Sequence, residues 1–388
     1  MNKKKMLRRI SEAVLGLFFV IILAVCAAAP EVQNAAAPLP PSGTVQATRA
    51  ITLTVNEIDR FGNITLNVPA AGVMSAGFAL GDMVRLELGS FNGIVPIVST
   101  YSEVDHGYPL VRFHATANVT MVAVNMGNFS ELYSIEAGMY ARISLVERGG
   151  YLAELEIRTL ERSYVREDYP SDVIFANFRE ARLGGIGANV IYRSTHPALN
   201  AGEMASRSPY SQRLAEAAGI ATVINLADHP HELSERAANV PWYQGFINRG
   251  SIIALGMGID YRNPDFAGQL KTGIEFMLEN RPPFLIHCNE GKDRAGVTVA
   301  LFGALMGATP DEIINDYMLS YINFYWVNPG EERYDLIAGI MRGILTDFNG
   351  GTMPGPGQTT AAAERYLSQV VELSTAQINA LKQLLSGN

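Results

Sequence analysis

Short runs of alternating apolar and polar residues follow one another along the chain from about residue 50. Such runs, rich in β-branched residues and broken by Gly, Asn and Asp, are typical of β-strands. The strands that this pattern predicts are residues 51–57, 63–68, 82–88, 93–99, 109–115, 120–125, 141–147 and 152–160. Their regular spacing, without long helical periods, predicts a small all-β barrel or sandwich.

The pattern changes after a hinge near residues 163–172. Apolar segments of β type alternate there with segments whose apolar positions recur at helical spacing, which predicts a central, mostly parallel sheet flanked by helices. The predicted strands are 190–194, 221–227, 251–257 and 283–288, and the predicted helices are 201–219, 266–280, 294–307, 310–326, 333–348, 362–371 and 375–385. We therefore expect an α/β domain preceded by a smaller all-β domain.

The amino-terminal segment has the pattern of a targeting signal. Positively charged residues within 1–9 precede an uncharged apolar run, 13–29, that ends in small residues. This order is typical of a secretory signal peptide, and the run is also close to the length that spans a bilayer. Residues 23–26 (LAVC) resemble a bacterial lipobox, although Val25 stands where a smaller residue is usual. Cleavage, a retained anchor and lipid attachment at Cys26 all stay open, and each predicts an extracytoplasmic body that is secreted or tethered to the membrane at the cell surface.

These patterns divide the 388 residues into four predicted parts: a signal (1–29), a linker rich in Pro and Ala (30–48), a β-rich accessory domain (49–163) and the α/β domain (168–388). The net charge of −8 argues against nucleic acid as a partner, because nucleic acid requires a basic face. The six histidines and two cysteines show no metal-ligand spacing. We expect neither a metal nor another cofactor.

One segment of the α/β part concentrates the residues suited to chemistry. It reads IHCNEGKDRAG (286–296) and connects a predicted apolar strand to a predicted helix. A tight loop in that setting turns backbone N–H groups inward at the positive end of the helix, which makes a nest for an anion. Arg294 can bind a phosphate through two parallel hydrogen bonds, and the same field favours the thiolate of Cys288. The pattern predicts attack of Cys288 on phosphorus and a phosphocysteine intermediate that water hydrolyses without a metal.

The loop resembles that of the cysteine-dependent tyrosine and dual-specificity phosphatases, and most of all the bacterial branch whose loop reads HCxAGKDRTG. Segments 177–179 (NFR), 192–194 (YRS), 218–226 and 316–320 (DYMLS) are similar to landmarks of that branch in the same order. The resemblance implies that Cys288 is the nucleophile. It implies that Arg294 binds phosphate, with the substrate-binding positions Asn289, Glu290, Gly291, Lys292, Ala295 and Gly296 around it.

Three loop residues bear on rate and substrate. Glu290 adds a carboxylate where the phosphate must approach, and Ala295 replaces the threonine or serine whose hydroxyl assists release of the cysteine. Both departures are consistent with slower turnover. Lys292 resembles the loop lysine of phosphatases that act on inositol phosphates and phosphoinositides, whereas a solvated surface lysine is the alternative.

The leaving oxygen needs a proton, so a general acid must reach it. Asp260, 28 residues before Cys288, lies in a segment that resembles the acid loop of dual-specificity phosphatases. Asp293 matches an aspartate in the loop of the bacterial branch, although it could instead pair with a neighbouring cation. The sequence leaves the choice between these two acids open, and it predicts that Asp265 caps the following helix.

The β-rich part carries a second resemblance. Segments 55–68 (VNEIDRFGNITLNV), 100–107 (TYSEVDHG) and 122–133 (VAVNMGNFSELY) are similar to the C-terminal β-domain of the S-adenosylmethionine hydrolase and fluorinase family. The catalytic acids of that family lie in an α/β domain with no counterpart here, so adenosine binding is not carried over. A hairpin turn built by Asp59 and its neighbours is the simpler interpretation.

The sequence thus predicts an extracytoplasmic phosphatase for phosphate monoesters, with a phosphorylated protein, a phosphoinositide or a soluble inositol phosphate as substrate. The alternative is a non-catalytic phosphate-recognising or cell-surface binding protein, which Glu290, Ala295 and the accessory domain favour.

Overall fold

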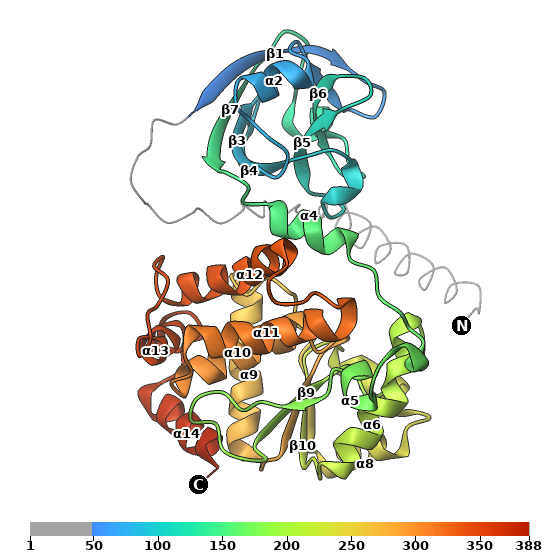
Figure 1. Cartoon of the computed structure of the whole chain (residues 1–388), viewed down its shortest axis with the longest axis vertical. Helices are drawn as coiled ribbons and strands as arrows, with labels where there is room; N and C mark the ends of the chain where they lie inside the picture. Colours follow the sequence, from blue (N-terminus) through green and yellow to red (C-terminus); the bar gives the residue numbers. More distant parts are fainter. Residues whose placement is uncertain (1–48, 388) are drawn as a thin grey trace, which may run out of the picture. The chain divides into compact units, whose positions relative to one another are not determined.

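The computed structural model describes residues 49–387 (Figure 1). The predicted signal and linker, with Cys26, lie outside the described residues. Between residues 49 and 387, no helix has both the length and the hydropathy that crossing a membrane requires.

The first part of the described chain is a closed seven-stranded barrel, so the predicted all-β domain is confirmed (Figure 1). Its strands are β1 (Ala50–Ile58), β2 (Ile64–Leu66), β3 (Met83–Leu88), β4 (Phe91–Val98), β5 (Pro109–His114), β6 (Val119–Val124) and β7 (Tyr140–Glu147). They are arranged in the order β1-β2-β6-β5-β4-β3-β7, and only β4 and β5 pair in parallel. Alternate residues fill the interior, as Val84, Leu86 and Leu88 of β3 do. Closure leaves no strand edge unpaired.

Two short helices, α2 (Ala70–Ser75) and α3 (Phe129–Tyr133), complete the barrel. The predicted turn between β1 and β2 is present. The Asp59 carboxylate accepts hydrogen bonds from the backbone N–H groups of Phe61 and Asn63, at 2.8 Å and 3.0 Å.

The predicted strand at 152–160 is wrong, because this segment is helix α4 (Leu152–Thr159). Its apolar positions fit both a strand period and a helical period over so short a run, and Leu, Ala and Glu are good helix formers. Packing then decides between the two. Leu155 contacts a small apolar cluster of the barrel, whereas Ile157 packs against the core of the α/β part.

The second part of the chain contains a five-stranded sheet, so the predicted mostly parallel sheet is also confirmed. Its strands are β8 (Arg179–Glu180), β9 (Ile191–Ser194), β10 (Thr222–Asn225), β11 (Ile252–Ala254) and β12 (Phe284–His287). The order is β11-β10-β12-β9-β8, and only β8 is antiparallel to its neighbour. β12 is therefore the middle strand.

Helices cover both faces of this sheet (Figure 1). They are α5 (Asp172–Phe175), α6 (Ser208–Ala217), α7 (Leu233–Ala237), α8 (Pro241–Arg249), α9 (Pro264–Glu279), α10 (Asp293–Leu305), α11 (Pro310–Tyr325), α12 (Glu332–Phe348), α13 (Thr359–Gln369) and α14 (Thr375–Ser386). Phe284 and Ile286 of β12 pack into the core shared with α9–α14, and Leu285 packs into the core shared with α6 and α8. Successive strand residues point to opposite faces, which explains the continuous apolar run of β12.

The predicted cap at Asp265 is wrong by two residues. Helix α9 starts at Pro264, and the side chain of Asn263 accepts the hydrogen bond from the Asp265 N–H. Proline suits the first helical position because its missing N–H would be unsatisfied there anyway.

Candidate active site

The loop predicted to carry the chemistry lies at the carboxyl end of the middle strand. β12 ends at His287, the buried Cys288 follows, and α10 begins at Asp293. The neighbouring parallel strands β9 and β10 end beside it, at Ser194 and Asn225. Ligands of open α/β sheets bind at this end of the strands.

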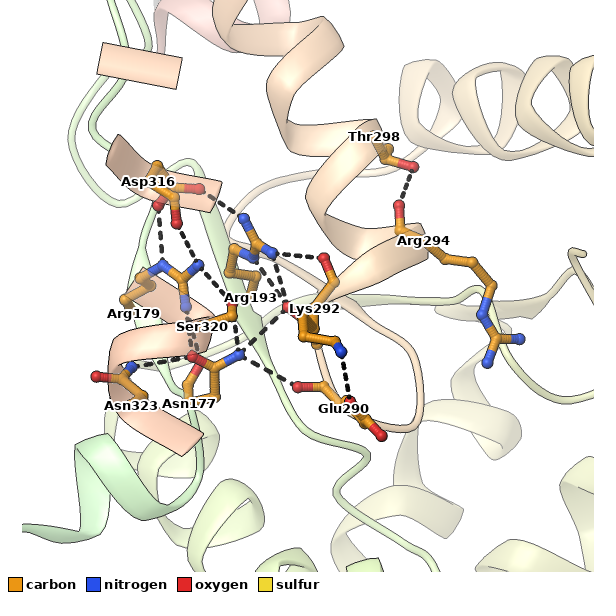
Figure 2. Close-up of polar contacts among 11 residues, drawn as sticks. Asn177, Arg179, Arg193, Glu290, Lys292, Arg294, Thr298, Asp316, Ser320 and Asn323 are labelled. Atoms are coloured by element: carbon orange, nitrogen blue, oxygen red, sulfur yellow. Dashed lines mark hydrogen bonds and ion pairs between the residues drawn. The ribbon is translucent and has the colours of Figure 1, made fainter. Parts of the chain in front are cut away.

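The carbonyl groups of residues 289–292 all accept hydrogen bonds from surrounding elements. Figure 2 shows the contacts that Asn177 and Arg193 make to the loop. The backbone N–H of His196 donates to the carbonyl of residue 289 at 3.2 Å, and Asn177 Nδ2 donates to that of residue 290 at 3.2 Å. Arg193 Nη2 donates to the carbonyl of residue 291 at 2.7 Å and to that of residue 292 at 3.1 Å. These contacts fix the peptide planes of the loop.

The N–H groups of residues 289–294 have no hydrogen-bond acceptor among residues 49–387. Because their carbonyls are bound to the surrounding protein, these donors remain available to an anion at the start of α10. Gly291 permits the turn: its φ is +64°, and a Cβ atom there would lie 2.2 Å from the backbone oxygen of Ser194. Within the described part of the chain, the loop therefore offers the unpaired N–H groups that the predicted nest requires.

Arg294 is anchored through one nitrogen. Its Nη1 donates to the carbonyls of Met257 at 3.0 Å and Leu226 at 3.4 Å, which follow β11 and β10. Its Nε is buried and has no partner within the described residues. A guanidinium held in this way can offer Nε and the other terminal nitrogen to two phosphate oxygens.

Asp316 of α11 holds Arg193, the arginine that donates to the loop carbonyls. It accepts from Arg193 Nη1 at 2.5 Å and from Arg179 Nε at 2.8 Å (Figure 2). Burial alone would raise the pKa of Asp316, but the charges of Arg179 and Arg193 lower it, so the carboxylate is ionised. The sequence identified these residues only as landmarks. A charged residue inside the buried strand IYRS is the signal that points to a role for Arg193.

Lys292 is buried, with 5% of its surface exposed, so the alternative of a solvated surface lysine is wrong. Its Nζ lies 3.4 Å from Glu290 Oε2 and 3.7 Å from Asp293 Oδ1, above the ring of Tyr321. Burial would lower the pKa of Lys292, but the charges of Asp293 and Glu290 raise it above its usual value. The ammonium group is therefore charged and already faces two carboxylates.

The Glu290 carboxylate has a second cationic partner that the sequence did not reveal. Arg162 Nη2 donates to its Oε1 at 2.7 Å. Burial would raise the pKa of Glu290, but Arg162 and Lys292 together lower it to about 2. Glu290 therefore carries its charge at neutral pH.

The two candidate acids occupy different positions around the loop. Asp260 is exposed between β11 and α9, three residues after the Met257 carbonyl that binds Arg294, and its carboxylate accepts from the N–H of Arg262 at 3.0 Å. Asp293 is the first residue of α10, and 44% of its side chain is exposed. Asp293 therefore faces a cation of the loop, whereas Asp260 accepts from a backbone N–H.

Other buried polar residues lie beneath the loop. His287 Nε2 is 3.1 Å from the hydroxyl of Tyr243, and burial lowers the pKa of His287, which keeps the ring neutral. Ala295 and Gly296, the remaining predicted binding positions, are buried at the start of α10. In residues 49–387, no three His, Cys, Asp or Glu side chains are grouped as a metal site would require.

Comparison with known proteins agrees with both resemblances. Residues 259–387 match the model of the tyrosine phosphatase family. Residues 53–142 match the model of the C-terminal domain of S-adenosylmethionine hydroxide adenosyltransferases. Both resemblances are thereby confirmed, and the tyrosine phosphatase match contains the whole loop from Cys288 to Arg294. No curated protein matches the chain.

Three solved structures are similar to parts of the chain. An uncharacterized conserved protein from Thermotoga maritima is 25% identical over 27% of this chain and 39% of its own, with a TM-score of 0.23. A conserved hypothetical protein from Thermus thermophilus is 28% identical over 27% and 37%, with a TM-score of 0.20. The core catalytic domain of the PP-IP phosphatase SIW14 from S. cerevisiae is 19% identical over 47% and 94%, with a TM-score of 0.26. The chain thus spans less than two fifths of the length of the first two proteins.

Proposed function

We propose that this protein is a phosphatase that hydrolyses phosphate monoesters through a phosphocysteine intermediate. One observation carries the proposal: the carbonyls of the loop are bound to the surrounding protein, and within the described residues its N–H groups and Arg294 Nε have no protein partner. Such an arrangement is complementary to a phosphate group placed above Cys288. The match to the tyrosine phosphatase family supports the same reaction.

The reaction follows from the roles proposed for these residues. The thiolate of Cys288 attacks phosphorus, so an S–P bond forms while the P–O ester bond breaks. A general acid, Asp260 or Asp293, gives its proton to the leaving oxygen. Arg294 and the loop N–H groups stabilise the charge that develops on the phosphoryl oxygens. Water then attacks phosphorus and breaks the S–P bond while it returns a proton to the carboxylate of the general acid, which releases inorganic phosphate and restores the thiolate and the acid.

The substrate classes in this proposal are a phosphotyrosine or other phosphorylated protein, a phosphoinositide and a soluble inositol phosphate. The amino-terminal pattern supports action outside the cytoplasm, in secreted or membrane-tethered form. A panel of these phosphate esters, assayed by release of inorganic phosphate, separates the classes.

The first test is the variant Cys288→Ser assayed on a generic aryl phosphate. We expect the variant to lose turnover by about 10³-fold or more, because serine lacks the nucleophilic thiolate. We also expect it to bind inorganic phosphate as the wild type does, because the loop N–H groups remain. Turnover retained by Cys288→Ser would disprove the mechanism.

One observation favours the alternative function of phosphate recognition without turnover. Ala295 offers no hydroxyl to assist breakdown of the intermediate, and the nearby Thr298 hydroxyl is bound to the Arg294 carbonyl at 2.9 Å. Tight binding of phosphopeptides or inositol phosphates by a wild type that releases no phosphate would establish this alternative.

A further inference from the structure

Arg162 lies outside both segments that match known families, in the stretch between α4 and α5. Only 13% of its side chain is exposed. Its guanidinium donates from Nη2 to Glu290 at 2.7 Å, from Nη1 to the Tyr325 hydroxyl at 2.9 Å and from Nε to the Tyr164 hydroxyl at 3.0 Å. Every nitrogen of the group therefore has a partner, and one partner belongs to the phosphate loop.

Aromatic rings fix the direction of this guanidinium. It lies 5.3 Å from the ring centroid of Tyr164, 5.6 Å from that of Phe324 and 5.5 Å from that of Tyr325. Cation–π attraction and the three hydrogen bonds together leave the side chain one orientation. The contact with Glu290 is thus held in place by the fold and is not a flexible surface pair.

Glu290 presents a charge problem to an anion site. Its own N–H belongs to the nest, and its carboxylate is ionised at neutral pH. A free carboxylate beside the nest would repel a phosphate dianion, and in partly buried surroundings such repulsion is stronger than in water. Arg162 binds one carboxylate oxygen and Lys292 lies beside the other. Figure 2 shows Glu290 turned toward Lys292, whereas Arg294 extends away from this pair.

We propose that Arg162 is a positioning residue of the phosphate site: with Lys292 it holds and neutralises the Glu290 carboxylate, so that the loop accepts a phosphate dianion despite its own acidic residue. This inference rests on the proposed phosphatase function. Under this proposal, the acidic residue at position 290 does not prevent the loop from binding phosphate.

The test compares Arg162→Met in two backgrounds, wild type and Glu290→Gln. In the wild-type background, we expect kcat/KM for an aryl phosphate to fall about tenfold or more at pH 7.5. In the Glu290→Gln background, where no carboxylate is released, we expect a loss of about threefold or less. Arg166→Met is the matched control. It removes another arginine–carboxylate pair of the same stretch, with Asp172 at 2.6 Å, and should leave kcat/KM unchanged.

The pH profile supplies a readout that a purely structural role would not move. The charged and titratable groups facing Glu290 are Arg162, Lys292 and the Tyr325 hydroxyl. Without Arg162, only Lys292 opposes the effect of burial, so we expect the pKa of Glu290 to rise from its low value and more of the carboxyl to be protonated as the pH falls. We expect the deficit of Arg162→Met to shrink as the pH falls from 7.5 to 5, and the deficit in the Glu290→Gln background to stay constant.

Binding of inorganic phosphate, measured by calorimetry on Cys288→Ser forms of the same variants, separates this inference from the proposed function. If the wild type shows no turnover, but Arg162→Met weakens phosphate binding more in the wild-type background than in the Glu290→Gln background, the phosphatase is refuted and the role of Arg162 is retained. Turnover by the wild type, with equal losses in both backgrounds, would overturn the role of Arg162 and leave the phosphatase standing. Loss of the fold by Arg162→Met in both backgrounds would also overturn it, because Arg162 would then act through stability alone.

Discussion

At the scale of single residues, the two candidate acids differ in what already holds them. The Asp260 carboxylate accepts from the backbone N–H of Arg262 within an exposed turn. Asp293 is 3.7 Å from the ammonium group of Lys292. The Asp293 carboxylate thus already faces a cation of the loop, whereas the Asp260 carboxylate is exposed and accepts from a backbone N–H. From this contrast we predict that Asp260 is the general acid.

We expect Asp260→Asn to impair the chemical step more than Asp293→Asn does. The measurement is kcat on two substrates that differ in leaving group, phenyl phosphate and p-nitrophenyl phosphate. Loss of a general acid lowers kcat by about 10²-fold or more for the poor leaving group and much less for the good one. The reverse ranking of the two variants would assign the role to Asp293. Equal losses on both substrates by Asp260→Asn would show that Asp260 does not transfer the proton.

The residues that sequence could identify are those whose chemistry is local. The spacing from Cys288 to Arg294, between a strand and a helix, predicts the nest directly. Arg193 and Arg162 escaped assignment because they lie far from the loop along the chain and only the fold brings them to Gly291 and Glu290. The hydrogen-bond partners of buried charges are set by tertiary packing, which no local pattern encodes.

At the scale of elements, β9 and α11 meet at an ion pair that supports the loop. Arg193 of β9 is fully buried, and burial together with the charge of Arg179 lowers its pKa to about 10, although Asp316 opposes that shift. Arg193 still remains charged at neutral pH. The Asp316 carboxylate therefore compensates a buried charge that also holds the carbonyls of the loop.

We predict that Asp316→Ala lowers the free energy of unfolding by about 3–5 kcal/mol, because it leaves Arg193 buried without its counter-ion. The readout is urea unfolding followed by tryptophan fluorescence, since Trp242 and Trp326 both belong to the α/β part. Asp335→Ala, with a 74% exposed side chain, is the control and should change little. A loss no larger than that of the control would contradict the structural role.

The same pair determines a pH dependence of stability. The pKa of Asp316 is lower in the folded state than in the unfolded chain, where it is about 4. The stability that ionised Asp316 contributes is therefore fully present above the unfolded-state pKa, and it is lost as the pH falls through the folded-state pKa. Asp316→Ala should therefore lack this part of the acid destabilisation.

Helices α9–α14 were predictable because their long runs show a clear helical period, and strands β9–β12 were predicted from short apolar runs between turn residues. Helix α8 was not predicted, and helix α4 was predicted as a strand. Its eight residues satisfy two periods, and contacts on both of its sides decide between them.

At the scale of the whole molecule, truncated chains can test whether the barrel takes part in the reaction or the α/β part carries it out alone. The loop, Arg193, Asp316 and both candidate acids all follow residue 167, but Arg162 precedes it. The stretch around Arg162 belongs structurally with the α/β part. Ile157 and Leu160 pack against its core, and Arg207 Nη2 donates to the Ser163 carbonyl at 2.6 Å.

We therefore predict different outcomes for two truncated chains. Residues 150–388 keep α4 and Arg162, and this chain should hydrolyse an aryl phosphate with a kcat/KM within about threefold of the full chain. Residues 168–388 lack Arg162, and this chain should show a loss of about tenfold that Glu290→Gln reduces. Tryptophan fluorescence checks the fold of each. If the chain 150–388 is folded and inactive, the barrel takes part in the reaction; if the two chains are equally active, the stretch before residue 168 is dispensable and Arg162 has no influence on the phosphate loop.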